Sequence, residues 1–233
     1  MGLGRRMIDV KALPVRRRTW MQTANIPRAR LGWEFEDCKD VHAEDLEKLK
    51  VWIEQVRKGN VIRADGKRSC GKGLLISGEP GNGKTTLALT VLQEMLRTFP
   101  LESFDGSMTM VRPCYFLTFN DVLDLKGKTM DDPSPDDEVL FSGLLGECKD
   151  DAYNIRVLVV DDIGKEHMST SGWQKNMLHH LLRTRFNNGL PTVVTTNIKL
   201  DAWDTLYGTA TESFAMEAFA HFILKSTRGD LRR

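Results

Sequence analysis

The sequence has no hydrophobic run that approaches 18 residues, the length that a membrane-spanning helix requires. Its N-terminus is basic, but no apolar segment of the kind found in secretory signal peptides follows it. The four cysteines lie far apart and include no C-x-x-C pair, which argues against a zinc site. We therefore expect a reduced, cytoplasmic protein without a membrane partner.

The chain carries almost no net charge, because 33 basic side chains nearly balance 32 acidic ones. The distribution is uneven: residues 1–30 hold eight cations against Asp9 alone, a net charge of +7, which leaves −6 for the remainder. We expect residues 1–24 to form a flexible basic arm and residues 25–233 to form one folded domain. Such an arm contacts nucleic acid or an acidic partner, or is a solvated tail. Trp20 fits stacking on bases, docking into a partner groove, or local packing.

Two further segments have distinctive compositions. Residues 42–56 place leucine, isoleucine and valine on one face at helical spacing, which predicts an amphipathic helix that packs on the core. Residues 126–138 contain five acidic residues and two prolines, which predicts a mobile acidic loop that serves as a solvated linker or gates a site.

Residues 78–86 fit the phosphate-binding pattern G-x-x-x-x-G-K-[ST]. A short apolar strand is predicted before them, at 73–77, and a helix after them, at 86–96, whose N-terminus would face the phosphates. Glycines let backbone N–H groups wrap closely around a triphosphate, Lys84 would reach the β- and γ-phosphates, and Thr85 would bind Mg²⁺. The expected nucleotide-binding residues are Gly78, Glu79, Pro80, Gly81, Asn82, Gly83, Lys84, Thr85 and Thr86.

A second motif ends in two acidic residues. The continuous apolar run in residues 156–164 predicts a central parallel strand that is buried on both faces. Ligands bind beyond the carboxyl ends of such strands, so Asp161 would hold Mg²⁺, directly or through water, and Asp162 would orient and deprotonate the attacking water. The alternative, that the two acids cap the next helix, is disfavoured by the phosphate-binding motif upstream.

Residues 191–197 predict another strand, with Asn197 at its carboxyl end. Asn197 would hydrogen-bond the attacking water or the γ-phosphate, or else it is an ordinary turn residue. The alternation of strands and helices predicts an α/β fold, a parallel sheet with helices on both faces.

This ordered series of motifs resembles the AAA+ ATPases of the DnaC/IstB type, which are replicative helicase loaders and the ATPase partners of transposases. The resemblance extends from about residue 26 to residue 232. The segments that carry it are a lead-in at 24–28, Walker A at 73–85, Walker B at 159–166, a helix and sensor 1 strand at 173–197, and a closing sensor 2 segment at 229–232.

The resemblance implies a P-loop AAA+ ATPase domain that uses ATP and Mg²⁺. We expect no separate C-terminal lid domain, because the sequence ends soon after Arg232. The roles that the resemblance assigns are Lys84 and Thr85 for phosphate and Mg²⁺, Asp161 for Mg²⁺, Asp162 for the base, Asn197 for sensor 1, and Arg232 for sensor 2, which touches the γ-phosphate.

The sequence departs from the family's pattern in two places. The family usually carries an arginine finger, which acts in trans, in the short helix before the last strand; here Met216 aligns best, and no arginine lies between Arg185 and Arg228. We therefore expect slow hydrolysis, a finger borrowed from a partner, or use of Arg183 or Arg185. Family loaders also often have a helicase-binding domain or zinc module at the N-terminus, where this chain has only the basic arm, so the mode of helicase binding stays open.

The resemblance implies an ATPase that binds single-stranded DNA, forms a homo-oligomer in the ATP state and delivers a replicative DNA helicase. One alternative is an IstB-like transposition ATPase that activates a transposase. Another is a nucleotide-dependent binding module with little turnover, which the absence of an evident finger favours.

Overall fold

The computed structural model describes residues 9–38, 41–58, 71–99, 110–164 and 172–224 of the chain. The helices are α1 (Val15–Thr23), α2 (Ala43–Arg57), α3 (Lys84–Thr98), α4 (Phe119–Asp131), α5 (Pro135–Leu145), α6 (Trp173–Asn187), α7 (Trp203–Tyr207) and α8 (Thr209–Ala218). The strands are β1 (Gly73–Gly78), β2 (Cys114–Thr118), β3 (Val157–Ile163), β4 (Thr192–Thr196) and β5 (Phe219–Leu224).

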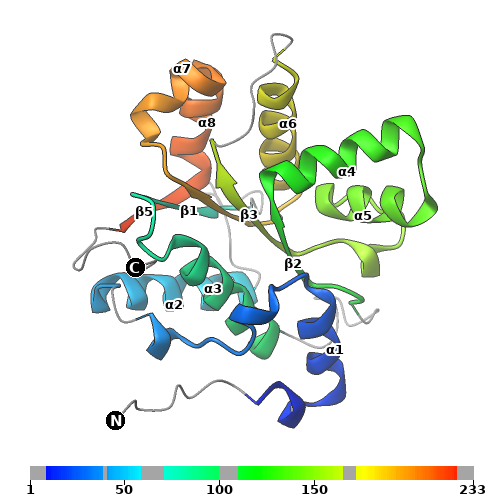
Figure 1. Ribbon diagram of the computed structural model, residues 1–233, viewed down its shortest axis with the longest axis vertical. Helices are drawn as coiled ribbons and strands as arrows, with labels where there is room; N and C mark the ends of the chain where they lie inside the picture. Colours follow the sequence, from blue (N-terminus) through cyan, green and yellow to red (C-terminus); the bar gives the residue numbers. More distant parts are fainter. Residues whose placement is uncertain (1–8, 39–40, 59–70, 100–109, 165–171, 225–233) are drawn as a thin grey trace.

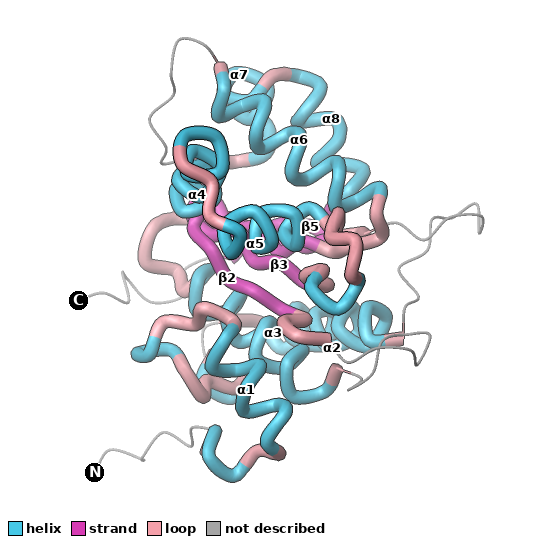
Figure 2. The backbone as a smooth tube through the Cα atoms, turned by 90° about the vertical axis from the view of Figure 1, so that its right-hand side faces the viewer, coloured by secondary structure: helices cyan, strands magenta, loops and turns pink. Residues whose placement is uncertain are grey.

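The five strands form one parallel sheet in the order β2-β3-β4-β1-β5. Helices α1, α2 and α3 cover one face of the sheet, and α4 to α8 lie on the other (Figures 1 and 2). Parallel strands are joined by crossover helices, which shield both faces from water. The predicted α/β architecture is therefore confirmed.

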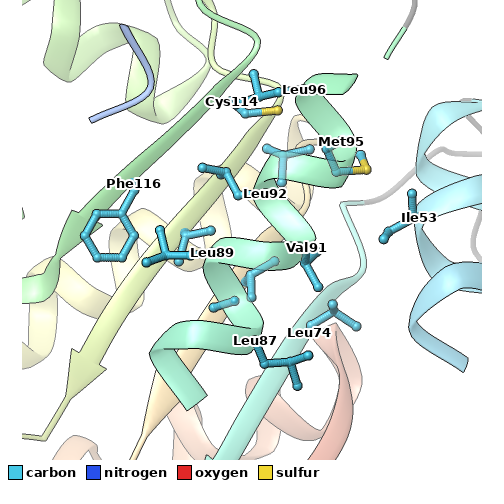
Figure 3. Close-up of a cluster of buried hydrophobic side chains, with 14 of the residues drawn as sticks. Ile53, Leu74, Leu87, Leu89, Val91, Leu92, Met95, Leu96, Cys114 and Phe116 are labelled. Atoms are coloured by element: carbon cyan, nitrogen blue, oxygen red, sulfur yellow. The ribbon is translucent and has the colours of Figure 1, made fainter. Parts of the chain in front are cut away.

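Side chains of the strands alternate between two hydrophobic clusters. Leu74 and Ile76 of β1 pack with α1, α2 and α3, whereas Leu75 packs with the helices of the opposite face. Figure 3 shows the first cluster, in which α3 lies between the sheet and α2. Because α3 is covered on both sides, ten of its 15 residues are buried, and the helix that follows the P-loop is fixed in the core.

The acidic segment 126–138 is not a mobile loop, as the sequence predicted; it forms the end of α4 and the start of α5. Ser134 caps α5 by accepting from the backbone N–H of Asp137, and Pro135 occupies the first turn. The acids at 136–138 lie in that first turn, where the helix dipole favours negative charge. The residues that resembled a linker are thus the end of one helix and the N-terminus of the next.

The described part of the N-terminal segment, residues 9–24, also differs from the expected flexible arm. Residues 15–23 form α1, and Trp20 is fully buried in the core, where its indole Nε1 donates a hydrogen bond to the carbonyl oxygen of Met110 at 3.0 Å. Arg17 donates to the carbonyl oxygen of Leu96 at the end of α3. Trp20 is therefore a packing residue, and the folded domain begins before residue 25.

The remaining expectations lie close to the observed elements. The amphipathic helix expected at 42–56 is α2, and the strands expected at 156–164 and 191–197 are β3 and β4. Among the described residues, no helix combines the length and the hydrophobicity that crossing a bilayer takes.

Candidate nucleotide-binding site

The predicted site residues meet at the carboxyl edge of the sheet. The P-loop follows β1, Asp161 and Asp162 lie at the end of β3, and Asn197 directly follows β4. In the register of the sheet, Thr196 of β4 pairs with β1 on one side and with β3 on the other. Asn197 is therefore placed between the P-loop and the two acids, in the position where open α/β sheets bind ligands.

The P-loop turns tightly between β1 and α3, and its shape depends on glycine at two positions. Gly83 has a φ of 81°, a conformation that residues with a Cβ rarely adopt, and it immediately precedes the first residue of α3. A Cβ on Gly78 would lie 2.5 Å from the carbonyl oxygen of Leu224 in β5. The loop therefore fits against β5 only when residue 78 has no side chain.

Lys84, the first residue of α3, points its ammonium group back into the loop. Its Nζ donates to the carbonyl oxygens of Gly78 at 2.9 Å and Glu79 at 2.7 Å, and the side chain is only 6% exposed. A buried ammonium needs such acceptors to offset its desolvation. The cation is thus held at the N-terminus of a helix, where backbone N–H groups also favour an anion.

Thr85 and Asp161 join the P-loop helix to β3. The Thr85 hydroxyl lies 3.0 Å from each carboxylate oxygen of Asp161, which is buried. Hydroxyl and carboxylate oxygens are the ligands that Mg²⁺ takes, and Mg²⁺ in nucleotide sites has few protein ligands because phosphates and water supply the others. No cluster of three His, Cys, Asp or Glu able to hold a metal exists in the described ranges. The pair fits Mg²⁺ that arrives with a nucleotide.

Asp162 occupies an irregular point of β3. Its φ is 63°, in the left-handed region, and the register between β3 and β4 shifts between Val160 and Ile163. Aspartate tolerates this conformation better than most residues, and a β-bulge of this kind commonly re-aims a side chain near an active site. Asp162 is partly exposed, so water can reach it.

Sequence reasoning missed the role of Thr195. This fully buried residue of β4 donates a hydrogen bond from its hydroxyl to Asp161 Oδ1 at 2.5 Å, and the Thr195 hydroxyl oxygen accepts from the backbone N–H of Asp162 at 2.9 Å. The sequence did offer one indication of this hydrogen bond. Thr195 lies in a predicted strand, and a hydroxyl that the sheet buries needs a polar partner. Which partner it finds depends on the register of β3 and β4.

Comparison of the sequence with protein-family models and with curated protein sequences finds no match. Comparison with solved structures finds the DnaC helicase loader, 22% identical, with a TM-score of 0.57 over 85% of this chain and all of that one. DnaI is 16% identical, with a TM-score of 0.55 over 86% of this chain and 95% of that one. The initiator DnaA, bound to AMPPCP and single-stranded DNA, is 12% identical, with a TM-score of 0.54 over 82% of this chain and 48% of that one.

This chain has a DnaC-like AAA+ fold. The likeness to DnaC covers 85% of this chain, whose five-stranded parallel sheet has helices on both faces. At these identities the comparisons support the AAA+ fold and leave the roles of individual residues to be argued from their geometry.

The two candidate arginine fingers, Arg183 and Arg185, differ in their exposure to solvent. Arg185 is fully buried and cannot reach another subunit, so its suggested use as a finger is wrong. Arg183 is exposed, and its guanidinium stacks 4.8 Å above the ring centroid of Phe214. Arg183 stays a prediction. The predicted sensor 2 residue, Arg232, lies outside the described residues.

The Arg185 guanidinium instead joins three strand and helix ends at the amino edge of the sheet. Burial lowers the pKa of Arg185 to about 9, so the group stays cationic at neutral pH. The hydrogen bonds of this guanidinium in the described part of the chain go to uncharged acceptors, which are carbonyl oxygens and one hydroxyl. The acceptors belong to Leu144, Ile155, Arg156, Pro191 and Thr192. This residue is structural, and it lies at the opposite edge from the P-loop.

Proposed function

We propose that the chain is a Mg²⁺-dependent ATPase that loads a replicative DNA helicase onto single-stranded DNA in the cytoplasm. One observation carries the ATPase part of the proposal: the Lys84 ammonium, the Thr85 hydroxyl and the Asp161 carboxylate are gathered at the carboxyl edge of the sheet. An ammonium and a hydroxyl–carboxylate pair at a helix N-terminus suit the phosphates of a nucleotide and its metal ion.

Binding would change the partners of the P-loop residues. Phosphate oxygens would replace the carbonyl oxygens of Gly78 and Glu79 as acceptors for Lys84, and the N-terminus of α3 would add its dipole. Thr85 and Asp161 would hold Mg²⁺, which neutralises negative charge on the β- and γ-phosphates when bound. The other nucleotide contacts would come from the backbone of residues 78–86.

Hydrolysis requires a water molecule that attacks the γ-phosphate in line with the leaving group. Asp162 would orient this water and accept its proton, because the carboxylate lies beside the Mg²⁺ residue and is open to solvent. Asn197 would hydrogen-bond the water or the γ-phosphate from the neighbouring strand end, and Arg232 would contact the γ-phosphate as sensor 2. The products are ADP and phosphate.

Turnover is expected to be slow in the isolated protein. The helix before the last strand, α8, carries Met216 at the position where the resemblance would place a trans-acting arginine, and Met216 is 60% exposed. This exposed position also favours a second candidate function, a nucleotide-dependent binding module with little hydrolysis. We expect a homo-oligomer in the ATP state, with ATP binding rather than rapid turnover as the main switch.

The loader role is supported by the likeness of the fold to DnaC and DnaI. Single-stranded DNA as a ligand is supported by the DnaA structure, which contains it together with AMPPCP. Lys11 and Arg16 of the N-terminal segment, with Arg28 shortly after it, supply exposed cations for phosphate contacts. A transposase is the competing partner.

Nucleotide binding is tested by titration with a fluorescent ATP analogue in the presence of Mg²⁺. Lys84→Ala should abolish binding of the analogue. Lys149→Ala, which removes an exposed lysine outside the P-loop, is the control and should leave the affinity unchanged. If the Lys84→Ala protein bound the analogue with the wild-type affinity, the assignment of the site would be contradicted.

The partner is tested by affinity capture from the native host. Asp162→Asn should keep ATP bound, so this variant serves as bait in the presence of ATP, and Lys84→Ala serves as the matched nucleotide-free bait. Recovery of a hexameric replicative helicase with the first bait alone supports the loader role. Recovery of a transposase would replace it with a transposition role.

A further inference from the structure

We propose that Thr195 is a positioning residue that uses one hydroxyl group to hold the Mg²⁺ residue Asp161 and the base Asp162 in fixed relation to the P-loop. This inference rests on the proposed ATPase function. It concerns a residue of β4 that neither the motifs nor the resemblance single out for a role of its own.

The hydroxyl of Thr195 links two neighbouring residues of β3 through different groups. It donates to the Asp161 carboxylate at 2.5 Å and accepts from the backbone N–H of Asp162 at 2.9 Å. A hydroxyl has one hydrogen to donate and two lone pairs, so both bonds can exist at once. Movement of Thr195 would therefore disturb a side chain and a main-chain position together.

The Asp161 carboxylate is held from both sides. Thr195 donates to Oδ1 from β4, and Thr85 donates from the first turn of α3. A carboxylate that must bind a metal ion is better oriented when a neighbouring group restricts its rotation, as partners of metal ligands commonly do. Thr195 is fully buried and belongs to a strand paired on both sides, so its own position is well fixed.

The second bond acts on backbone geometry. Asp162 has a left-handed φ of 63° at the point where the β3–β4 ladder is irregular. Such a conformation is unfavourable for a residue other than glycine, and it persists where neighbouring groups fix it. The Thr195 hydroxyl accepts the Asp162 N–H at this break in the ladder. The direction of the Asp162 side chain therefore depends on Thr195.

Thr192 offers a matched comparison within the same strand. It is 3% exposed, and its hydroxyl accepts a hydrogen bond from Arg185 at the opposite end of β4. Replacing either threonine with valine removes one buried hydroxyl from the same strand while keeping the branched shape. A merely structural role would make the two variants alike, and a positioning role would separate them at the site.

The first measurement uses the nucleotide-free protein, so it does not depend on ATPase activity. Hydrogen exchange of the Asp162 amide, followed by NMR, should accelerate about tenfold in Thr195→Val, the fold-change for loss of one hydrogen bond of ordinary strength. Thr195→Ser should restore slow exchange, because serine keeps the hydroxyl. Thr192→Val should leave the Asp162 amide unchanged.

The second measurement records steady-state ATP hydrolysis as a function of Mg²⁺ concentration. Thr195→Val should lower kcat and raise the half-saturating Mg²⁺ concentration, each by about 10- to 100-fold, the usual effect of losing a partner of a metal ligand. Thr195→Ser should recover most of both values, and Thr192→Val should match the wild type. The wild-type value of each quantity is the reference for all three variants.

The two failures are distinguishable. If Thr195→Val and Thr192→Val have the same amide exchange, kcat and Mg²⁺ dependence, the positioning role is overturned while the ATPase function stands. If the wild-type protein binds no ATP, the proposed function is overturned and this inference falls with it.

Discussion

The side-chain amide of Asn82 donates a hydrogen bond to the carbonyl oxygen of Leu224, at 3.1 Å, and so ties the P-loop to the end of β5. The same carbonyl oxygen lies so close to Gly78 that a side chain at this position would collide with it. Two residues of the P-loop thus depend on one atom of the last described strand.

Asn82→Ala should weaken nucleotide binding without unfolding the protein. The variant loses one hydrogen bond of about 0.5–1.5 kcal/mol, which corresponds to a roughly 2- to 12-fold increase in Kd for an ATP analogue if the loop must be held in its binding shape. Calorimetric titration measures the change. Asn176→Ala, at an exposed position of α6, is the control and should keep the wild-type Kd. Equal affinities in the two variants would show that the link to Leu224 is not needed for binding.

Trp20→Ala should destabilise the protein by about 3–5 kcal/mol. The indole is fully buried in the cluster that also holds α3, and its Nε1 donates to Met110. Urea unfolding followed by circular dichroism measures the free energy of unfolding. Arg16→Ala, an exposed change in the same helix, should stay within about 0.5 kcal/mol of the wild type.

The burial of Trp20 also determines how DNA contacts of the N-terminal segment should be tested. Removing residues 1–20 would remove Trp20 from the core, so weaker DNA binding by that truncation would not identify a contact. Neutralising Arg16 and Arg28 removes charge without removing core volume. If these residues contact phosphates, the double variant should bind single-stranded DNA more weakly and with a smaller dependence on salt.

Arg185→Met should cost about 3–5 kcal/mol of folding free energy, because it leaves several buried carbonyl oxygens without their donor. Arg185→Lys should not restore stability, since an ammonium cannot reproduce the fork of guanidinium donors. Both variants should keep the wild-type Kd for nucleotide at temperatures where they are folded, because Arg185 lies at the amino edge of the sheet. A selective loss of nucleotide affinity with unchanged stability would contradict this structural role.

The motif-bearing elements were predictable from sequence for local reasons. The P-loop glycines, the apolar run of β3 and the amphipathic pattern of α2 each depend on neighbours within a few residues. The predicted partners Thr85 and Asp161 then met because carboxyl ends of parallel strands lie on one edge.

The errors concern features that depend on distant or competing interactions. The partner of Trp20 lies 90 residues away, so α1 could not be separated from a solvated basic arm by composition alone. The acids at 136–138 have the composition of a linker, and only the cap at Ser134 with Pro135 turns them into a helix start. The role of Thr195 follows from the irregular β3–β4 register, which no periodicity encodes. Arg185 was suggested as an arginine finger, which must reach another subunit, because arginine is seldom fully buried.

Met216→Arg should raise the rate of ATP hydrolysis if oligomers form with α8 facing the neighbouring site. The side chain is 60% exposed, so arginine can be placed there without the cost of burying a charge. A correctly placed arginine finger contributes about 10³–10⁵ in rate, and an imperfect one should still give at least a tenfold increase. Met130→Arg, at a comparably exposed position near the end of α4, is the control.

The trans action of such a finger can be separated from an effect within one subunit. The double variant Lys84→Ala, Met216→Arg cannot use its own P-loop but still carries the new arginine. Mixed with wild-type protein, it should stimulate hydrolysis in a manner that grows with concentration, because each wild-type site would receive arginine from a neighbour. Lys84→Ala alone should not stimulate. If the double variant also fails to stimulate, α8 does not face the neighbouring site, and the finger has to come from Arg183 or from a partner protein. Arg183→Ala separates these two sources. It would lower the concentration-dependent rate if Arg183 is the finger and leave that rate unchanged if a partner protein supplies it.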